Sequence, residues 1–351
     1  MKLPSLAFAA VVAGVVVGAP LPTQADAPRL FEGHDPLTIE LEATWDPIRN
    51  DDTPEPKAHP GVLSYAGPSG DVRIPVQIAA SGRSRRIMDI CELPPLRLDL
   101  PKLERKGTLF RGMGEFKLAT HCNNNLQYEQ YALLEYLVYR SYALLTDQSH
   151  RVRLLHVRYR ETGRAKPRWE RYGFAIEDAS DLARRVGAER FKESRIDGES
   201  LDPTAASRAE MFFFMIGMTD FSLIARDGGP CCHNARALRR PDGVVIPVPY
   251  DFDQTGVVDA EYAMPNEQLG IRSVVQRKFR GKCRPPEVSA ASIALLREKR
   301  PAIRALFEAQ EGLSPVHARS ALRFLDGFYS WADDPKRVAK TLDAECASTA
   351  R

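Results

Sequence analysis

Two aspartates separated by one residue follow an apolar run in the second half of the chain. Asp251 and Asp253 stand in the segment PVPYDFDQTG, and the residues before them, GVVIPVPY, have the composition of a buried strand. A carboxylate is costly to bury unless a cation or a hydrogen-bond donor accompanies it. The spacing therefore predicts that these aspartates hold a bound partner at the end of the strand.

Two further polar side chains stand beside apolar elements. Asp220 follows an apolar helix in IGMTDFS, and Asn234 ends CCHN just before a strand. Asp, Asn and Asp in this order suit phosphoryl transfer, in which one aspartate serves the nucleophile while the other oxygens hold Mg²⁺ against phosphates. Mg²⁺ keeps several waters, so two or three protein oxygens suffice. Each residue alone has a structural reading as well, Asp251 in a turn and Asp220 as a helix C-terminal cap.

Phosphates also require a cation from the protein. Lys117 lies in EFKLATHC, where its alternation with Phe116 and Leu118 suits a sheet residue that points into a cleft. Glu135 lies on a long helix further along the chain and is preferred to Glu129 as the residue that holds the lysine in place. We expect Lys117 and Glu135 to approach within salt-bridge range, although the exposed face of a hairpin would also carry a lysine.

The order of these motifs resembles that of the CotH-type atypical kinases. The resemblance is strongest in MFFFMIGMTDFS, CCHNARAL and VVIPVPYDFDQTG, and it covers roughly residues 72–260. It implies Asp220 as the catalytic aspartate and Asp251 as the principal metal ligand. Asn234 and Asp253 would assist in holding the metal.

The resemblance extends to a basic loop. IAASGRSRR is similar to the family's Gly/Ser phosphate loop, and PPLRLDL is similar to the strand after it. This implies nucleotide contacts from Gly82 and Ser84. It also offers Arg97, which lies nearer the family's usual basic position, as an alternative to Lys117. The chain departs from the family where Ala79 stands close to the usual place of an arginine.

The family's chemistry implies an enzyme that transfers the γ-phosphoryl group of ATP, with Mg²⁺, to a hydroxyl group of a protein substrate. Two other functions stay open. One is a non-catalytic exported binding module with a degenerate kinase fold, and the other is a nucleotidyl transferase that uses the same cleft.

Other metals fit the sequence less well. DFDQTGVVDAEY partly matches a calcium-binding loop, but Tyr262 occupies the twelfth position, where a bidentate glutamate is needed. THC and CCH contain zinc-ligand types without the two-residue gap that structural zinc sites prefer. A cysteine protease is disfavoured, because the neighbours His121 and Cys122 cannot easily face each other.

The N-terminus has the pattern of an export signal. Lys2 precedes an apolar run over 6–19, and small residues follow, with cleavage expected after Ala25. We therefore expect a signal peptide over 1–25 and a periplasmic or extracellular protein, with an N-terminal membrane anchor as the alternative. No other segment predicts a membrane span. The net charge of +3 over 351 residues gives no reason to expect a nucleic-acid partner.

Six cysteines in an exported chain favour disulfides. Cys91 and Cys122 stand at the ends of strand segments that would meet in an antiparallel pair, so we expect them to bond. Cys283 is expected to pair with Cys231 or Cys232.

The elements that must position these residues follow from periodicity. Alternating segments predict strands over 37–45, 61–67, 71–80, 96–100, 107–122, 151–161 and 171–178, and a long helix is predicted over 126–146. The second half predicts helices over 203–218, 288–311, 314–332 and 335–346 and a strand pair over 235–253. The first half predicts an antiparallel sheet with one helix laid on it. Together with the resemblance, these patterns predict an α+β, two-lobed, kinase-like fold. Its sheet lobe would span 30–178, and its helical lobe, which carries the catalytic and metal motifs, would span 179–351.

Overall fold

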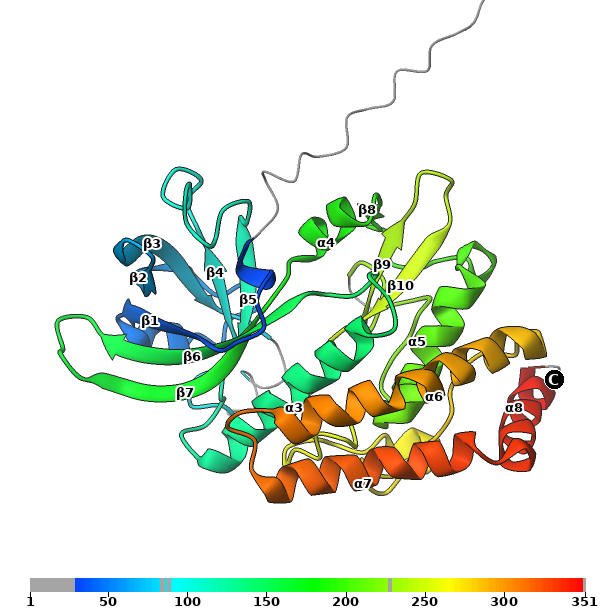
Figure 1. Cartoon of the computed structure of the whole chain (residues 1–351). Helices are drawn as coiled ribbons and strands as arrows, with labels where there is room; N and C mark the ends of the chain where they lie inside the picture. The colour runs from blue at the N-terminus through cyan, green and yellow to red at the C-terminus, as the bar shows by residue number, and fades with distance from the viewer. Residues whose placement is uncertain (1–28, 83–85, 87–89, 227–228, 350–351) are drawn as a thin grey trace, which may run out of the picture.

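The computed structural model describes residues 29–82, 86, 90–226 and 229–349. The expected signal peptide and Ser84 lie outside the described residues. Figure 1 shows the strands of the first half gathered on one side of the molecule and the long helices of the second half on the other.

Seven strands close into a barrel in the order β1-β2-β3-β4-β5-β7-β6. They are β1 (Leu37–Ala43), β2 (His59–Gly67), β3 (Gly70–Ala80), β4 (Leu96–Asp99), β5 (Glu115–Ala119), β6 (Val152–Glu161) and β7 (Pro167–Ile176). Neighbours pair antiparallel except at the closure, where β1 runs parallel to β6 from Leu37 opposite Leu155 to Ala43 opposite Glu161.

The expected two-lobed, kinase-like fold with an antiparallel sheet is therefore wrong. The strands form a closed barrel and not an open sheet. The strand segments themselves were largely predictable from their alternation. Their closure was not, because it depends on a parallel pairing between β1 and β6, which lie far apart in the sequence and share no turn signal.

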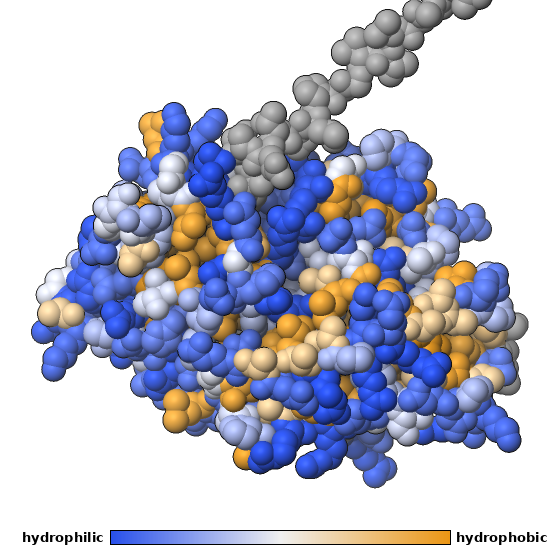
Figure 2. All heavy atoms as spheres, in the orientation of Figure 1, coloured by the Kyte–Doolittle hydropathy of each residue, from blue (hydrophilic) through white to orange (hydrophobic). Residues whose placement is uncertain are grey.

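Inward side chains fill the barrel, as expected for a closed sheet of this size. Ile39, Leu41, Val76, Leu98 and Phe116 are among the buried residues of this core. The alternation seen in the sequence places the intervening polar residues outside. In the view of Figure 2, hydrophilic side chains cover most of the barrel's face.

One histidine is buried against the aromatic part of this core. The ring of His121 lies 5.5 Å from that of Tyr159 and 6.2 Å from that of Trp169. Neither ring nitrogen has a hydrogen-bond partner among the described residues. Burial lowers the pKa of His121 to about 3, so the ring is neutral in the folded protein.

The long helix α3 (Leu126–Ala143) connects β5 to β6 and packs against the barrel strands and α6. The Asn125 side chain caps its start by accepting a hydrogen bond from the Gln127 N–H at 2.9 Å. Nearly every side chain of α3 is buried, including Glu135. A helix with no polar face belongs in the interior, so α3 can carry a carboxylate into the centre of the protein.

The rest of the chain combines helices with a three-stranded sheet of order β10-β9-β8. The elements are α4 (Ala179–Arg185), β8 (Glu189–Arg190), α5 (Pro203–Ile216), β9 (Ala235–Arg239), β10 (Val245–Pro249), α6 (Pro286–Ala309), α7 (Pro315–Ala332) and α8 (Pro335–Thr349). Short elements are η2 (Arg29–Phe31), α1 (Trp45–Arg49), η3 (Gly198–Ser200) and η4 (Glu267–Leu269). Among the described residues, no helix is both long and apolar enough to cross a lipid bilayer.

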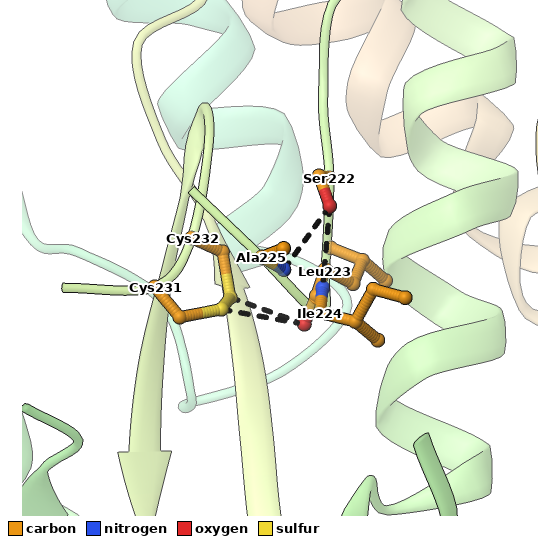
Figure 3. The surroundings of a disulfide bond; sticks show 6 residues. All are labelled: Ser222, Leu223, Ile224, Ala225, Cys231 and Cys232. Carbon is orange, nitrogen blue, oxygen red and sulfur yellow. Dashed lines mark hydrogen bonds between the residues drawn. A yellow bond between two sulfur atoms is a disulfide. The ribbon is translucent and has the colours of Figure 1, made fainter. Parts of the chain in front are cut away.

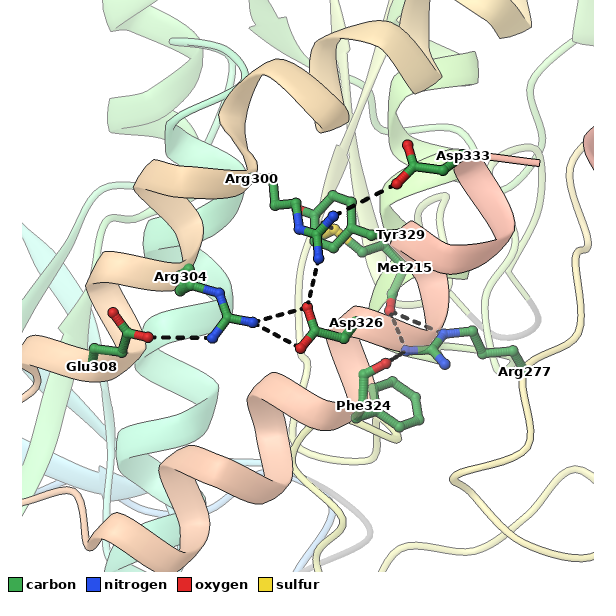
Figure 4. Close-up of polar contacts among 9 residues, drawn as sticks. All are labelled: Met215, Arg277, Arg300, Arg304, Glu308, Phe324, Asp326, Tyr329 and Asp333. Atoms are coloured by element: carbon green, nitrogen blue, oxygen red, sulfur yellow. Dashed lines mark hydrogen bonds and ion pairs between the residues drawn. The ribbon is translucent and has the colours of Figure 1, made fainter. Parts of the chain in front are cut away.

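Charged side chains join α6 to α7 (Figure 4). The Asp326 carboxylate accepts hydrogen bonds from Arg300 at 3.0 Å and from Arg304 at 2.7 and 2.9 Å. Arg277 reaches across from the preceding loop and donates to the main-chain oxygens of Met215 and Phe324. These contacts hold the end of α5 against α7, close to the segment that carries Asp220.

The cysteines form three disulfides. Cys91 bonds to Cys122 with the Cα atoms 4.5 Å apart, which confirms the expected pairing. The pairing expected for Cys283 is wrong, since Cys283 bonds to Cys346 and the neighbours Cys231 and Cys232 bond to each other. No sequence pattern predicted that α8 would lie against the start of α6, where this bond forms. The disulfides are compatible with an exported protein.

Candidate functional site

Three carboxylates from two elements meet in the interior. Glu135 of α3 and Asp251 and Asp253 of the segment after β10 each offer one oxygen, and these oxygens lie within 4.8 Å of one another. Glu135 and Asp253 are buried, whereas the Asp251 side chain is 34% exposed. Oxygen ligands of this kind suit Mg²⁺, Ca²⁺ or Mn²⁺. The arrangement can hold a divalent cation. When no cation is bound, the negative charges of the three carboxylates lie close together.

Backbone contacts at the end of the β9–β10 pair orient Asp251 and Asp253. Pro249 pairs with Ala235, and the next N–H, that of Tyr250, donates to the Asn234 carbonyl oxygen at 3.1 Å. Asp251 then adopts a left-handed backbone with φ of 65° and donates its N–H to the Tyr139 hydroxyl at 2.9 Å. A non-glycine residue rarely adopts this conformation. The turn is held by its surroundings, and it directs Asp251 toward α3.

Phe252 anchors the same turn. Its ring is fully buried and lies 4.6 Å from the ring of Tyr139 and 5.9 Å from that of Phe212. Because Phe252 occupies the core, the carboxylates on either side of it are fixed in position. Burial, together with the nearby Glu135 carboxylate, raises the pKa of Tyr139 well above its usual value, so its hydroxyl keeps its proton.

Lys117 reaches this cluster from the barrel. Its ammonium group lies 3.6 Å from Asp251 Oδ1 and donates to the Tyr250 hydroxyl at 2.9 Å. The side chain is 17% exposed. Arg97 is the cross-strand neighbour of Lys117, but its guanidinium pairs with Glu115 at 3.3 Å on a half-exposed surface. The lysine is therefore the better placed of the two candidate cations.

A second polar group lies beside the carboxylates. Asp220 Oδ2 lies 2.9 Å from His233 Nε2, and the Asn234 side-chain N–H donates to the main-chain oxygen of Asp220 at 2.6 Å. The hydrogen bond from His233 holds the pKa of Asp220 below its usual value, and the same bond raises the pKa of His233. The negative charge of Asp251 acts to raise the pKa of both Asp220 and His233. An ionised carboxylate and a basic imidazole thus stand next to the candidate cation site.

His233 was not predicted as a site residue. Within CCHN, the sequence favoured Asn234 as a site residue and offered the histidine only as a zinc-ligand type, whereas the structure turns His233 toward Asp220. The signal that could have found it is its position directly before Asn234, in a loop that had to meet the one carrying Asp220.

A β-bridge between Ser222 and His233 joins these two loops, and the Cys231–Cys232 disulfide of the second loop packs against Leu223 of the first (Figure 3 shows the disulfide). The Ser222 N–H donates to the His233 carbonyl oxygen at 3.1 Å, and the reverse bond from the His233 N–H measures 3.2 Å. Cys232 Sγ lies 3.1 Å from the Leu223 carbonyl oxygen. These contacts fix the distance between the Asp220 loop and the His233 loop.

The remaining predicted residues make their contacts elsewhere. Gly82 follows the end of β3 with a φ of 76°, and its carbonyl oxygen accepts a hydrogen bond from Arg86 at 3.0 Å. No described contact joins Gly82 to the carboxylate cluster, and Ser84 lies outside the described residues. Lys117, Glu135, Asp251 and Asp253 are brought together, with Asp220 and Asn234 beside them.

The structure disfavours the other metal readings. The third carboxylate of the cluster comes from α3 and not from the twelfth position of a calcium-binding loop. The cysteines of THC and CCH are in disulfides and have no thiolate to offer zinc.

The chain matches no protein-family model and no curated protein. The functional argument therefore depends on the site itself.

Proposed function

We propose that this protein transfers a phosphoryl group from ATP to a hydroxyl group, with a divalent cation held by Glu135, Asp251 and Asp253. The observation that carries the proposal is the meeting of these carboxylates with Lys117 at Asp251. A cation held by these carboxylates would offset the negative charge of the phosphate groups. A cation site with a lysine at its edge is what a polyphosphate substrate needs.

Lys117 supports the proposal as a phosphate contact. Tyr250 holds its ammonium group from one side and Asp251 attracts it from the other. The lysine is therefore kept in place before a substrate arrives, which lowers the entropic cost of binding.

Asp220 and His233 would serve the acceptor. The lowered pKa of Asp220 keeps it ionised near neutral pH, so it can accept a hydrogen bond from the attacking hydroxyl group. His233 holds the carboxylate in its orientation. The proton of the hydroxyl group would pass to this pair as the new P–O bond forms and the bond between the γ-phosphorus and the bridging oxygen breaks, with ADP as the leaving group.

The motif resemblance to the CotH-type kinases favours a protein hydroxyl as acceptor and Mg²⁺ as the cation. The proposal does not depend on a kinase fold, since the barrel departs from one. Export to the periplasm or the extracellular space is part of the proposal, and the three disulfides are its structural support.

Calorimetric titration with ATP, with and without Mg²⁺, tests the proposal. Binding should require Mg²⁺ and should be lost in Asp253→Asn. Asp220→Asn should bind Mg²⁺–ATP like the parent but should transfer phosphate more slowly. Glu298→Gln is a matched control, because this carboxylate is 66% exposed on α6. Magnesium-independent behaviour in the parent would refute the proposal.

The products separate two chemistries. Release of ADP identifies phosphoryl transfer, and release of pyrophosphate identifies the nucleotidyl transfer that the same site could support. If the parent binds Mg²⁺–ATP and releases neither, the protein is a non-catalytic binding module.

A further inference from the structure

A small cavity lined by arginines lies next to the candidate site. It measures about 130 Å³, and Arg190, Arg226 and Arg236 line it together with Phe191 and Cys231. These arginines come from β8, from the loop before the Cys231–Cys232 disulfide and from β9. Three segments distant in the sequence therefore direct guanidinium groups to one place.

The charge of this cavity is one-sided. No carboxylate lines it, and none of the three guanidinium groups forms a salt bridge with a described residue. Nearby arginines behave differently, since Arg239 pairs with Glu193 at 2.7 Å and Arg185 pairs with Glu177 at 2.8 Å. The Glu115 carboxylate is near enough for its charge to interact with Arg190. Three converging guanidinium groups without a salt-bridge partner nevertheless raise the local positive potential and favour the binding of an anion.

The cavity is connected to the candidate cation site through one side chain. The Arg236 guanidinium lies over the Tyr250 ring at 4.2 Å, and the hydroxyl of the same tyrosine accepts the hydrogen bond from Lys117. On the other side, the positive charge of Arg226 acts on His233. The arginines are thus adjacent to two groups in the proposed function. Arg236 is next to Tyr250, which holds the phosphate-binding Lys117, and Arg226 is near His233 on the acceptor side.

Size and chemistry restrict the ligand. The volume corresponds to about four waters at roughly 30 Å³ each, which suits a phosphate group. Pockets for whole drug-sized ligands are larger, from about 300 Å³ upward. Arginine presents a planar fork of donors that matches two phosphate oxygens.

We propose that this cavity binds a phosphate group, either free inorganic phosphate or a phosphate monoester carried by a larger substrate. The placement of such a substrate as the acceptor rests on the proposed function. Phosphate binding itself does not, because it uses none of the carboxylates.

The test is calorimetric titration of the full chain with inorganic phosphate and, separately, with phosphoserine, at low ionic strength and without Mg²⁺ or ATP. Arg226→Gln and Arg236→Gln should each weaken binding by about 10- to 100-fold, since each removes charge-assisted hydrogen bonds. Arg226→Gln leaves the contact with Tyr250 untouched, so its effect cannot come from a displaced tyrosine. Arg158→Gln is the control, because this half-exposed arginine pairs with Glu170 on the barrel.

The two ligands distinguish the sources. Tighter binding of phosphoserine identifies a phosphate carried by a substrate, and equal or tighter binding of inorganic phosphate identifies free phosphate. The proposal is overturned if the parent shows no saturable binding of either ligand, or if both arginine variants bind like the parent. Asp253→Asn should keep full phosphate binding, so a failure of the cation site and a failure of this cavity give different results.

Discussion

Asp253→Asn tests whether the carboxylate cluster exists to hold a cation. Asp253 is 6% exposed, and one of its oxygens lies within 4.8 Å of oxygens of Glu135 and Asp251. At this separation two unit negative charges repel by about 3.5 kcal/mol when the effective dielectric constant is about 20. Asparagine keeps the shape of the side chain and removes the charge. The variant should therefore be more stable than the parent when no divalent cation is present.

The size of the gain has an upper limit. A carboxyl group that is too costly to ionise takes up a proton instead, which at pH 7 costs about 4 kcal/mol from an ordinary pKa of about 3.9. Lys117 also offsets part of the repulsion through Asp251. We expect the free energy of unfolding to rise by about 1–3 kcal/mol in Asp253→Asn.

Mg²⁺ should cancel most or all of this difference in stability. A ligand that binds only the folded state at about 100 times its dissociation constant adds about 2.7 kcal/mol to stability. The parent should gain this amount and the variant should gain little. Urea unfolding with EDTA and with Mg²⁺ measures both changes, with Glu298→Gln as the control. A variant that is less stable than the parent without metal, and that responds to Mg²⁺ as the parent does, would refute the reasoning.

Three further predictions use other parts of the molecule. Lys117→Met should weaken the binding of Mg²⁺–ATP by about 10-fold or more, because a hydrogen bond to a charged group contributes about 1.5–3 kcal/mol. Unchanged affinity in calorimetry would show that the lysine does not contact the nucleotide. Cys346→Ser opens the bond to Cys283 across a sequence separation of 63 residues and should lower the free energy of unfolding by up to about 4 kcal/mol, measured in urea with the reduced parent as control. Burial lowers the pKa of His121 to about 3 and that of His150 to about 4, so the unfolded chain binds protons that the folded protein does not. Stability should be full above about pH 6.5 and fall toward acid by about 2 kcal/mol per histidine at pH 5, a loss that His121→Phe should reduce in urea unfolding.

The helices could be predicted from the sequence because each one shows its own pattern. Those expected over 314–332 and 335–346 are α7 (Pro315–Ala332) and α8 (Pro335–Thr349) in the structure. Proline at the first turn and an apolar stripe mark them locally. The closure of the barrel is not local, since β1 meets β6 across the whole of the intervening sheet and α3.

The disulfides also differ in whether local sequence patterns could predict them. Cys91 and Cys122 could be paired because strand patterns place them at neighbouring strand ends. Cys283 could not be assigned to Cys346, because that bond depends on the direction in which α8 leaves α7. Periodicity gives the length of a helix and which of its faces is apolar, but it does not give the path of the chain after it.

For the candidate site, the sequence indicated residue types that the fold then had to bring together. Asp251 and Asp253 could be recognised because carboxylates beside a buried strand are costly. Glu135 was expected to hold Lys117 in place, because of its order along the chain, and the structure places its carboxylate in the cluster with Asp251 and Asp253. His233 and the arginine-lined cavity were missed, because both arise from contacts between separate loops and strands.

The two residues with positive φ at the end of the β9–β10 pair explain how one small sheet serves both halves of the proposed chemistry. Asn234 precedes β9 with φ of 49° and Asp251 follows β10 with φ of 65°. Such conformations cost about 1–3 kcal/mol each and persist where the surroundings enforce them. The Asn234 side chain turns toward Asp220, whereas Asp251 turns toward Glu135 and Lys117. Because the Tyr250 N–H bonds to the Asn234 carbonyl oxygen, the Asp220–His233 pair and the carboxylate cluster are tied together at one end of this sheet, as the proposed transfer would require.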